Sequence, residues 1–201
     1  MARVRTWTWW LAAGAGVAAV WWLTKGRRDD GDVLRLKDGR VVRIREVRPE
    51  DKPLFVRALR TARDQTVYHR FGTVKRRFSP QELRYLTEVD GSNHYAIGAT
   101  MRSAGALRGV AVARFVRDPR DPSQAEAAVA VADDVQGVGL GRTLFIHIAL
   151  AARSRGIVRL VCPVLATNRA SLALMRRLDP EAAFEPDGEW VLATLDLARV
   201  L

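Results

Sequence analysis

The alternation of apolar and polar residues after the first thirty positions predicts a pair of antiparallel strands. Two runs, VLRL and VVRIREV, repeat with a period of two on either side of Asp38 and Gly39. This dipeptide is typical of a tight hairpin turn, and a period of two places alternate side chains on opposite faces of a strand. We expect the second run to direct Val42 and Ile44 into the core.

A helical periodicity then replaces the alternation. Pro49 suits the first turn of a helix over residues 50–62, which carries an apolar side. Ser79 is a good N-cap, Pro80 a good first helical residue, and Glu82 completes a capping box, so a second helix is expected to begin there. A short segment, DQTVYHRFG, lies between the two helices and is assigned no element.

Three apolar strands are expected next, in HYAIGATMR, LRGVAVARFVRD and AEAAVAVADD, and the short turns between them imply antiparallel neighbours. A helix with an apolar face follows, then the apolar strand IVRLVCPV, a helix that begins near Asn168, and a hairpin in FEPDGEWVLATLDL. The strand–helix–strand connections of this half favour parallel neighbours. The pattern therefore predicts an α/β fold of the mixed α+β kind, with helices on both sides of one sheet.

The first thirty residues form a separate unit in the pattern. The stretch WTWWLAAGAGVAAVWWLT, from Trp7 to Thr24, contains no charge and holds five of the six tryptophans near its two ends. Eighteen helical residues rise about 27 Å, close to the ~30 Å of bilayer hydrocarbon, and indoles favour the lipid–water interfaces. We expect residues 1–30 to be an N-terminal membrane anchor with a basic flank, and residues 31–201 to be the globular domain.

A cleaved signal peptide and a buried core helix are the alternatives for this segment. Trp21 and Trp22 occupy positions where a signal peptide needs small residues. The stretch also lacks a polar face, and basic residues flank it on both sides, so charge alone leaves the orientation of an anchor open.

Composition supports a packed domain and limits its partners. Apolar residues make up 48% of the 201 residues, and the net charge of +11 permits attraction to phosphates or acidic partners. No block of like charges is long enough for a nucleic-acid-binding tail, so no specific nucleic acid is expected. The densest basic cluster, Arg70, Lys75, Arg76 and Arg77, is either a solvated face or a surface for an acidic partner or a phosphorylated cofactor.

Cysteine and histidine give no sign of a disulfide or a metal site. Cys162 is the only cysteine and lies in an apolar run, where a buried, inert thiol is expected. His69, His94 and His147 are far apart and lack the spacing of metal ligands, so no metal is expected.

Glycine at every second position of DDVQGVGLGRTLF, residues 133–145, points to an anion site. The first turn of a helix carries free N–H groups and about half a positive charge, and glycine lets a ligand approach the backbone. The spacing matches neither GxxxxGK[ST] nor GxGxxG, which argues against nucleotide-hydrolysing and dinucleotide-binding loops. The pattern predicts a nest for a diphosphate, with Arg142 adding charge; a plain strand-to-helix turn is the alternative.

The glycine string resembles the Q/R-x-x-G-x-G/A acetyl-CoA diphosphate motif of the GNAT N-acetyltransferase superfamily; its residues are Gln136, Gly137, Val138, Gly139, Leu140 and Gly141. The acidic pair before it, Asn168 after the next strand, and the element order from Val41 to Leu197 agree with that superfamily. More closely, LKDGRVVRIREVRPED, Tyr68-x-Arg70-Phe71 and AEAAVAVADD resemble the catalytic domain of bacterial protein lysine acetyltransferases.

The resemblance implies a GNAT-like central sheet, part antiparallel and part parallel, flanked by helices and here preceded by one transmembrane helix. It implies direct transfer of acetyl from acetyl-CoA to an amine, with Glu126 aligned to the general base of the lysine acetyltransferase group. Apolar Ala125, Ala127 and Ala128 would raise the pKa of Glu126 by desolvation; an exposed strand-edge carboxylate is the alternative.

The resemblance also assigns cofactor contacts. Val129, Ala130 and Val131 would offer backbone groups to the thioester oxygen and to the pantetheine arm. Asn168 would contact the cofactor, although a helix cap would look the same in the sequence. Together with the glycine string and Arg142, these residues form the expected acetyl-CoA site.

Two departures from the superfamily concern the leaving group and the acceptor. Met175 stands where a tyrosine general acid is common, and LDPEAAF replaces a common Gly-Phe, so the shape of the acceptor side is open. The implied function is acetylation of a protein lysine; a small-amine acetyltransferase and a non-catalytic acetyl-CoA-binding regulatory module are alternatives. Because acetyl-CoA is cytosolic, the expected location is a single-pass membrane protein whose catalytic domain faces the cytoplasm.

Overall fold

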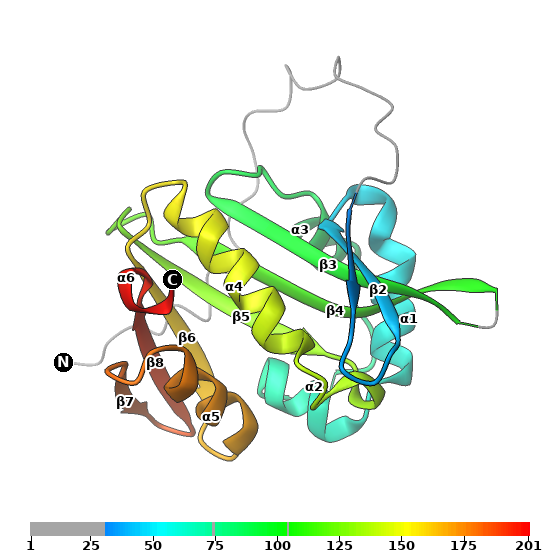
Figure 1. Ribbon diagram of the computed structural model, residues 1–201. Helices are drawn as coiled ribbons and strands as arrows, with labels where there is room; N and C mark the ends of the chain where they lie inside the picture. The colour runs from blue at the N-terminus through cyan, green and yellow to red at the C-terminus, as the bar shows by residue number, and fades with distance from the viewer. Residues whose placement is uncertain (1–30, 74, 104) are drawn as a thin grey trace. The chain divides into compact units, whose positions relative to one another are not determined.

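The computed structural model describes residues 31–73, 75–103 and 105–201 (Figure 1), and Gly31–Leu201 forms one compact unit. The expected anchor, Trp7–Thr24, lies outside the described residues. Within the described ranges, no helix is long and apolar enough to cross a membrane, which corrects the expected single-pass membrane localisation. The longest of these helices has 14 residues and rises about 21 Å, short of the hydrocarbon thickness of ~30 Å.

The described chain follows the predicted order of strands and helices, with two further helices over Asp64–Phe71 and Leu197–Val200. The strands are β1 (Asp32–Arg35), β2 (Val41–Glu46), β3 (His94–Ser103), β4 (Ala106–Arg117), β5 (Gln124–Val131), β6 (Arg159–Leu165), β7 (Ala183–Asp187) and β8 (Trp190–Asp196). The helices are α1 (Lys52–Thr61), α2 (Asp64–Phe71), α3 (Pro80–Thr87), α4 (Leu140–Arg153), α5 (Arg169–Leu178) and α6 (Leu197–Val200), with single 3₁₀ turns at Pro49–Asp51 and Asp133–Val135.

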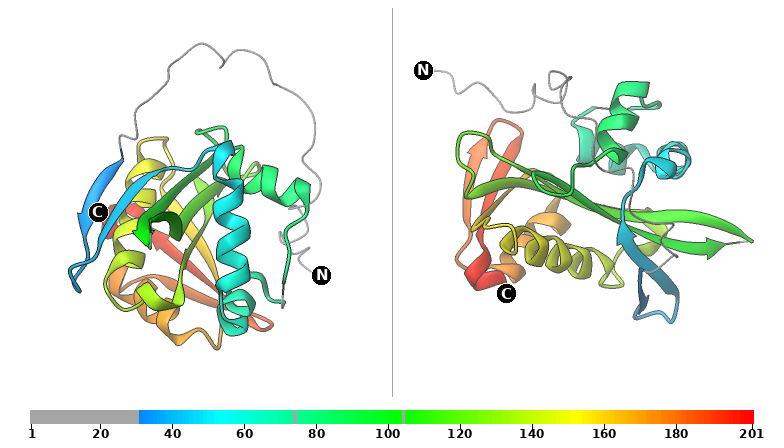
Figure 2. Two further views of the ribbon diagram at one scale, coloured as in Figure 1. Left: turned by 90° about the vertical axis from the view of Figure 1, so that its right-hand side faces the viewer. Right: turned by 90° about the horizontal axis from the view of Figure 1, so that it is seen from above.

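The eight strands form one mixed sheet in the order β1-β2-β3-β4-β5-β6-β8-β7. The β5–β6 pair is parallel and the other pairs are antiparallel, as the connection through α4 predicts. The sequence also predicted that β6 and the strand after α5 would be parallel neighbours. This prediction is wrong, because β8 lies between β6 and β7 and pairs with both in the antiparallel direction. Two views show α4 on one face of the sheet and α1, α2 and α3 on the other (Figure 2).

The core lies chiefly between α4 and the sheet. The predicted apolar face of α4 is fully buried, with Leu144, Phe145 and Ile148 at most 1% exposed. It packs in one cluster with Phe115 of β4 and Ala127 of β5. Because β5 alternates, this packing sends the side chains of its odd-numbered residues toward α4 and those of its even-numbered residues toward α1 and α3.

The segment DQTVYHRFG, to which the sequence pattern assigned no element, is helical. It forms α2, and Gly72 ends that helix in the left-handed conformation at φ 66°. Val67 of this helix is buried at 3% exposure. The helix has little apolar surface in total, so the spacing of its apolar residues gives only a weak helical pattern.

The capping box of α3 has the predicted geometry. The Ser79 hydroxyl accepts from the Glu82 N–H at 3.2 Å, and the Glu82 carboxylate accepts from the Ser79 N–H at 2.8 Å. Ser79→Ala is therefore expected to lower the free energy of unfolding by about 1 kcal/mol, measured by urea denaturation. Ser92→Ala, at an exposed loop serine, is the control; equal midpoints for the two variants would contradict the expectation.

Candidate active site

The two parallel strands separate beyond their first residues. Residues 124–126 of β5 pair with residues 159–161 of β6. From there β5 continues to Val131 and β6 to Leu165, but the two strands form no further pairs with one another. The backbone groups on their facing edges are thus not used in a β5–β6 ladder, and a second extended chain can pair with them.

Glu126 stands at the point where this opening begins. It is the last residue of β5 paired to β6, and on its other side it lies opposite Val116 of β4. The side chain is half-buried between paired strands, so it is not an exposed strand-edge carboxylate. Of the three alanines expected to surround it, Ala125 and Ala127 point to the opposite face, and only Ala128 shares its face.

Two side chains of the sheet have strongly shifted pKa values. Burial, with a further contribution from the Glu126 charge, raises the pKa of the Cys162 thiol far above its usual range, so that thiol is inert. Burial, followed by the charge of Arg114, lowers the pKa of His94 to about 3, so the imidazole is neutral. Its Nε2 lies 3.2 Å from Nη1 of Arg114, and Nη2 of the same guanidinium donates to the Leu86 carbonyl at 3.2 Å.

The glycine loop follows β5 and opens α4. Gly137 and Gly139 have φ of 76° and 92°, which strongly favours glycine, and Gly139 is the N-cap of α4. A Cβ at Gly137 would meet nothing within 4 Å, so this part of the loop faces open space. Leu140 is buried at 1% exposure, so it can serve a ligand only through its backbone N–H; the missing Cβ of Gly141 would lie 3.5 Å from Val131.

The acidic pair before the glycines holds the loop in place. Asp133 accepts from the Arg63 N–H at 3.0 Å and from the Thr66 hydroxyl. Asp134 accepts from both terminal nitrogens of Arg108 at 2.7 and 2.6 Å, and these bonds lower the pKa of Asp134. The pair therefore fastens the loop to α2 and to β4.

The remaining predicted contacts lie around the same opening. The Gln136 side chain donates to the Val131 carbonyl at 3.1 Å and so braces the loop against β5. Asn168 caps α5, because its side chain accepts from the Ser171 N–H at 3.1 Å. Arg142 is exposed on the first turn of α4. Val129 and Ala130 lie in the part of β5 that no longer pairs with β6.

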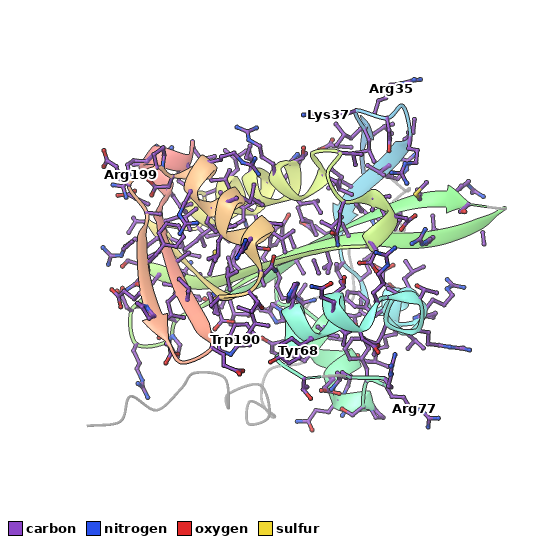
Figure 3. The ribbon with its side chains drawn as sticks, turned by 90° about the horizontal axis from the view of Figure 1, so that it is seen from below. Arg35, Lys37, Tyr68, Arg77, Trp190 and Arg199 are labelled. Carbon is purple, nitrogen blue, oxygen red and sulfur yellow. The ribbon has the colours of Figure 1, made fainter. Side chains whose placement is uncertain are left out.

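Helix α2 connects the two sides of the opening, and the sequence pattern missed it. One end is fastened behind β5 through Asp133, as described above. At the other end, the Tyr68 hydroxyl donates to Glu189 at 3.4 Å, and a Cβ on Gly72 would lie 2.8 Å from Cζ2 of Trp190 (Figure 3). Trp190 begins β8 and pairs with Leu165 at the end of β6. We call α2 the bridging helix.

A cavity of about 430 Å³ lies between α1, α3 and the sheet, on the same face of the sheet as the bridging helix. Its lining is mostly apolar, from residues such as Leu54, Phe55 and Val112. Arg45 and Asp51 form an ion pair at the cavity wall, in which Arg45 donates to both carboxylate oxygens of Asp51 at 2.7 Å. Although burial alone would raise the pKa of Asp51, these bonds hold it below the ordinary value.

Comparisons with known proteins agree with this geometry. The Acetyltransferase (GNAT) family matches residues 56–179. Acetyltransferase PA5475 of Pseudomonas aeruginosa is 32% identical over 160 residues, which cover 79% of this chain and 86% of the relative. Acetyltransferase Pat of Mycolicibacterium smegmatis is 32% identical over 145 residues, 72% of this chain but 43% of Pat, so the chain spans less than half of that relative's length.

A solved structure has the same fold. The GNAT domain of S. lividans PAT superposes with a TM-score of 0.72 at 25% identity, over 83% of this chain and 96% of that domain. The resemblance carried by the glycine string and the element order is confirmed by these matches, and so is the expected enzyme class. The chain belongs to the GNAT family, whose members are N-acetyltransferases that use acetyl-CoA.

Proposed function

We propose that residues 31–201 transfer the acetyl group of acetyl-CoA to the ε-amine of a protein lysine. The observation that carries the proposal is the position of Glu126, at the start of an opening between β5 and β6 that leads to the glycine loop. The relative named Pat and the similar GNAT domain of S. lividans PAT support a protein as the acceptor.

The described residues fit acetyl-CoA as co-substrate. The N–H groups of the glycine loop and of the first turn of α4 offer donors to the diphosphate, with no N-cap side chain competing for them. The six residues from Glu126 to Val131 extend about 17 Å, and beyond Glu126 the backbone groups that do not pair with β6 can bond the amides of a pantetheine arm. Acetyl-CoA supplies the acetyl group as an activated thioester.

Glu126 would act as the base. A lysine ε-amine has a pKa of ~10.4 and attacks only when it has lost a proton. The Glu126 carboxylate would accept that proton directly or through one water, on a face where small Ala128 leaves room beside it. A backbone N–H in the stretch Val129, Ala130 and Val131 would donate to the thioester oxygen as negative charge develops there.

Met175 cannot protonate the leaving sulfur. Met175 is buried at 4% exposure and packs in the core cluster, so the methionine that replaces the common tyrosine contributes to core packing. A thiol of pKa near 8.5 leaves acceptably as a thiolate, so the reaction does not require an acid at that place.

The acceptor is tested with the full chain and radiolabelled acetyl-CoA. We expect label to appear on protein bands of a bacterial lysate, and mass spectrometry to place the acetyl groups on lysine side chains. A panel of small amines incubated in parallel should remain unlabelled. Label confined to the small amines would contradict a protein acceptor, and binding of acetyl-CoA without transfer to either would contradict the enzymatic assignment.

A further inference from the structure

Backbone hydrogen bonds close the turn between β1 and β2, and this turn reaches the glycine loop. Leu36 is buried at 5% exposure, and its backbone closes the turn through bonds with Arg40 at 2.8 Å and Gly39 at 3.0 Å. Next to it, Lys37 extends toward the first turn of α4 (Figure 3). Its Cε lies 3.7 Å from the place of a Cβ on Gly139, the N-cap of that helix.

Arg40 fastens this turn to the loop. Its Nη2 donates to the Asp134 carbonyl at 2.9 Å, and its Nη1 lies 3.8 Å from the Asp134 carboxylate. Its Nε donates to Asp38 at 2.7 Å within the turn itself. The position of Lys37 relative to α4 is therefore set by bonds on both sides of the turn.

The charges around Lys37 favour an anion. Asp38 is bonded to Arg40, Asp134 to Arg108, and Asp133 to groups of the bridging helix, while Lys37 has no ion pair within the described ranges. A cation at the first turn of a helix is unfavourable by itself, because the helix dipole is positive there. The hairpin turn holds the backbone of Lys37 beside that helix, and Arg142 is exposed on the first turn of α4, so a bound anion would relieve the repulsion.

We propose that Lys37 is a further cofactor-binding residue, whose ammonium donates to the diphosphate of coenzyme A held at the glycine loop. The inference rests on the proposed cofactor site and adds to it a residue that lies outside the matched family segment 56–179. A lysine ammonium binds phosphate as a compact point charge, so the contact strengthens affinity and depends on ionic strength.

The test is calorimetric binding of coenzyme A to the full chain at low salt, independent of turnover. Lys37→Ala is expected to bind about fivefold more weakly, as for one partly exposed charged contact, while Lys37→Arg stays near the wild type. Arg35→Ala removes an equal charge from the same hairpin, two residues away and pointing elsewhere (Figure 3), and should have no effect. The Lys37→Ala deficit should shrink at about 0.5 M salt.

A second ligand shows which phosphate group of coenzyme A contacts Lys37. With 3′-dephospho-coenzyme A, which keeps the diphosphate, the Lys37→Ala deficit should persist. A deficit that vanishes with this ligand would overturn the diphosphate assignment, and equal affinities of Lys37→Ala and wild type for coenzyme A would overturn the role of Lys37. Failure of the wild type itself to bind coenzyme A would instead contradict the proposed function.

Discussion

Glu126→Gln is expected to reduce kcat by about 10²–10⁴-fold and to leave the affinity for coenzyme A unchanged. The amide has the shape of the carboxylate but cannot accept the proton of the attacking amine. Glu126 is half-buried between two paired strands, so the substitution keeps the backbone of the site in place. The rate is measured as release of free thiol in the presence of protein acceptor, and the affinity by calorimetry.

The pH dependence separates loss of the base from general damage. More of the lysine amine is unprotonated as pH rises toward its pKa of ~10.4, so the deficit of Glu126→Gln should narrow at high pH. Glu185→Gln, at an exposed carboxylate of β7, is the control and should keep wild-type rates. Full turnover by Glu126→Gln at neutral pH would place the base elsewhere.

Gly72→Ala is expected to destabilise the protein by about 2–4 kcal/mol and to reduce turnover. Gly72 has φ of 66°, which an L-residue adopts at a cost, and the new Cβ would lie 2.8 Å from Cζ2 of Trp190. The indole is buried at 5% exposure and has little room to move, so the end of the bridging helix must shift away from β8. Unfolding in urea and kcat are the two measurements.

Gly91→Ala is a matched control for this effect. Gly91 has φ of 75°, but a Cβ there would meet nothing within 4 Å. It should show the conformational cost alone, about 1–2 kcal/mol, with turnover unchanged. If Gly72→Ala costs no more stability than Gly91→Ala and keeps full turnover, the contact with Trp190 does not support the site.

The sequence predicted those parts of the fold that depend on local chemistry. The turn at Asp38 and Gly39, the capping box of Ser79 and Glu82, and the antiparallel strands before the glycine loop all have short-range causes and are confirmed. The placement of β8 between β6 and β7 is a long-range choice that no nearby residue encodes. The bridging helix was missed because it buries little, although Gly72 was a usable stop signal.

For the candidate site, the sequence predicted a class of ligand but did not predict the shape of the site. Regular glycine spacing before an apolar helix favours an anion site, and this signal is readable from the sequence without the tertiary structure. The opening between β5 and β6 depends on a register of three residue pairs, which the sequence does not reveal. The opposite orientation of Ala127 and Glu126, by contrast, follows from simple alternation along a strand and could have been deduced.

The order of the strands has a practical consequence for the design of shortened versions of this enzyme. A fragment cut at residues 56 and 179 would lose β1 and β2 beyond one side of β3, and β7 and β8 beyond one side of β6. Both newly exposed strands would present open rows of N–H and C=O groups, which recruit strands from other molecules. Such a fragment would keep the glycine loop and Glu126 yet be prone to aggregate.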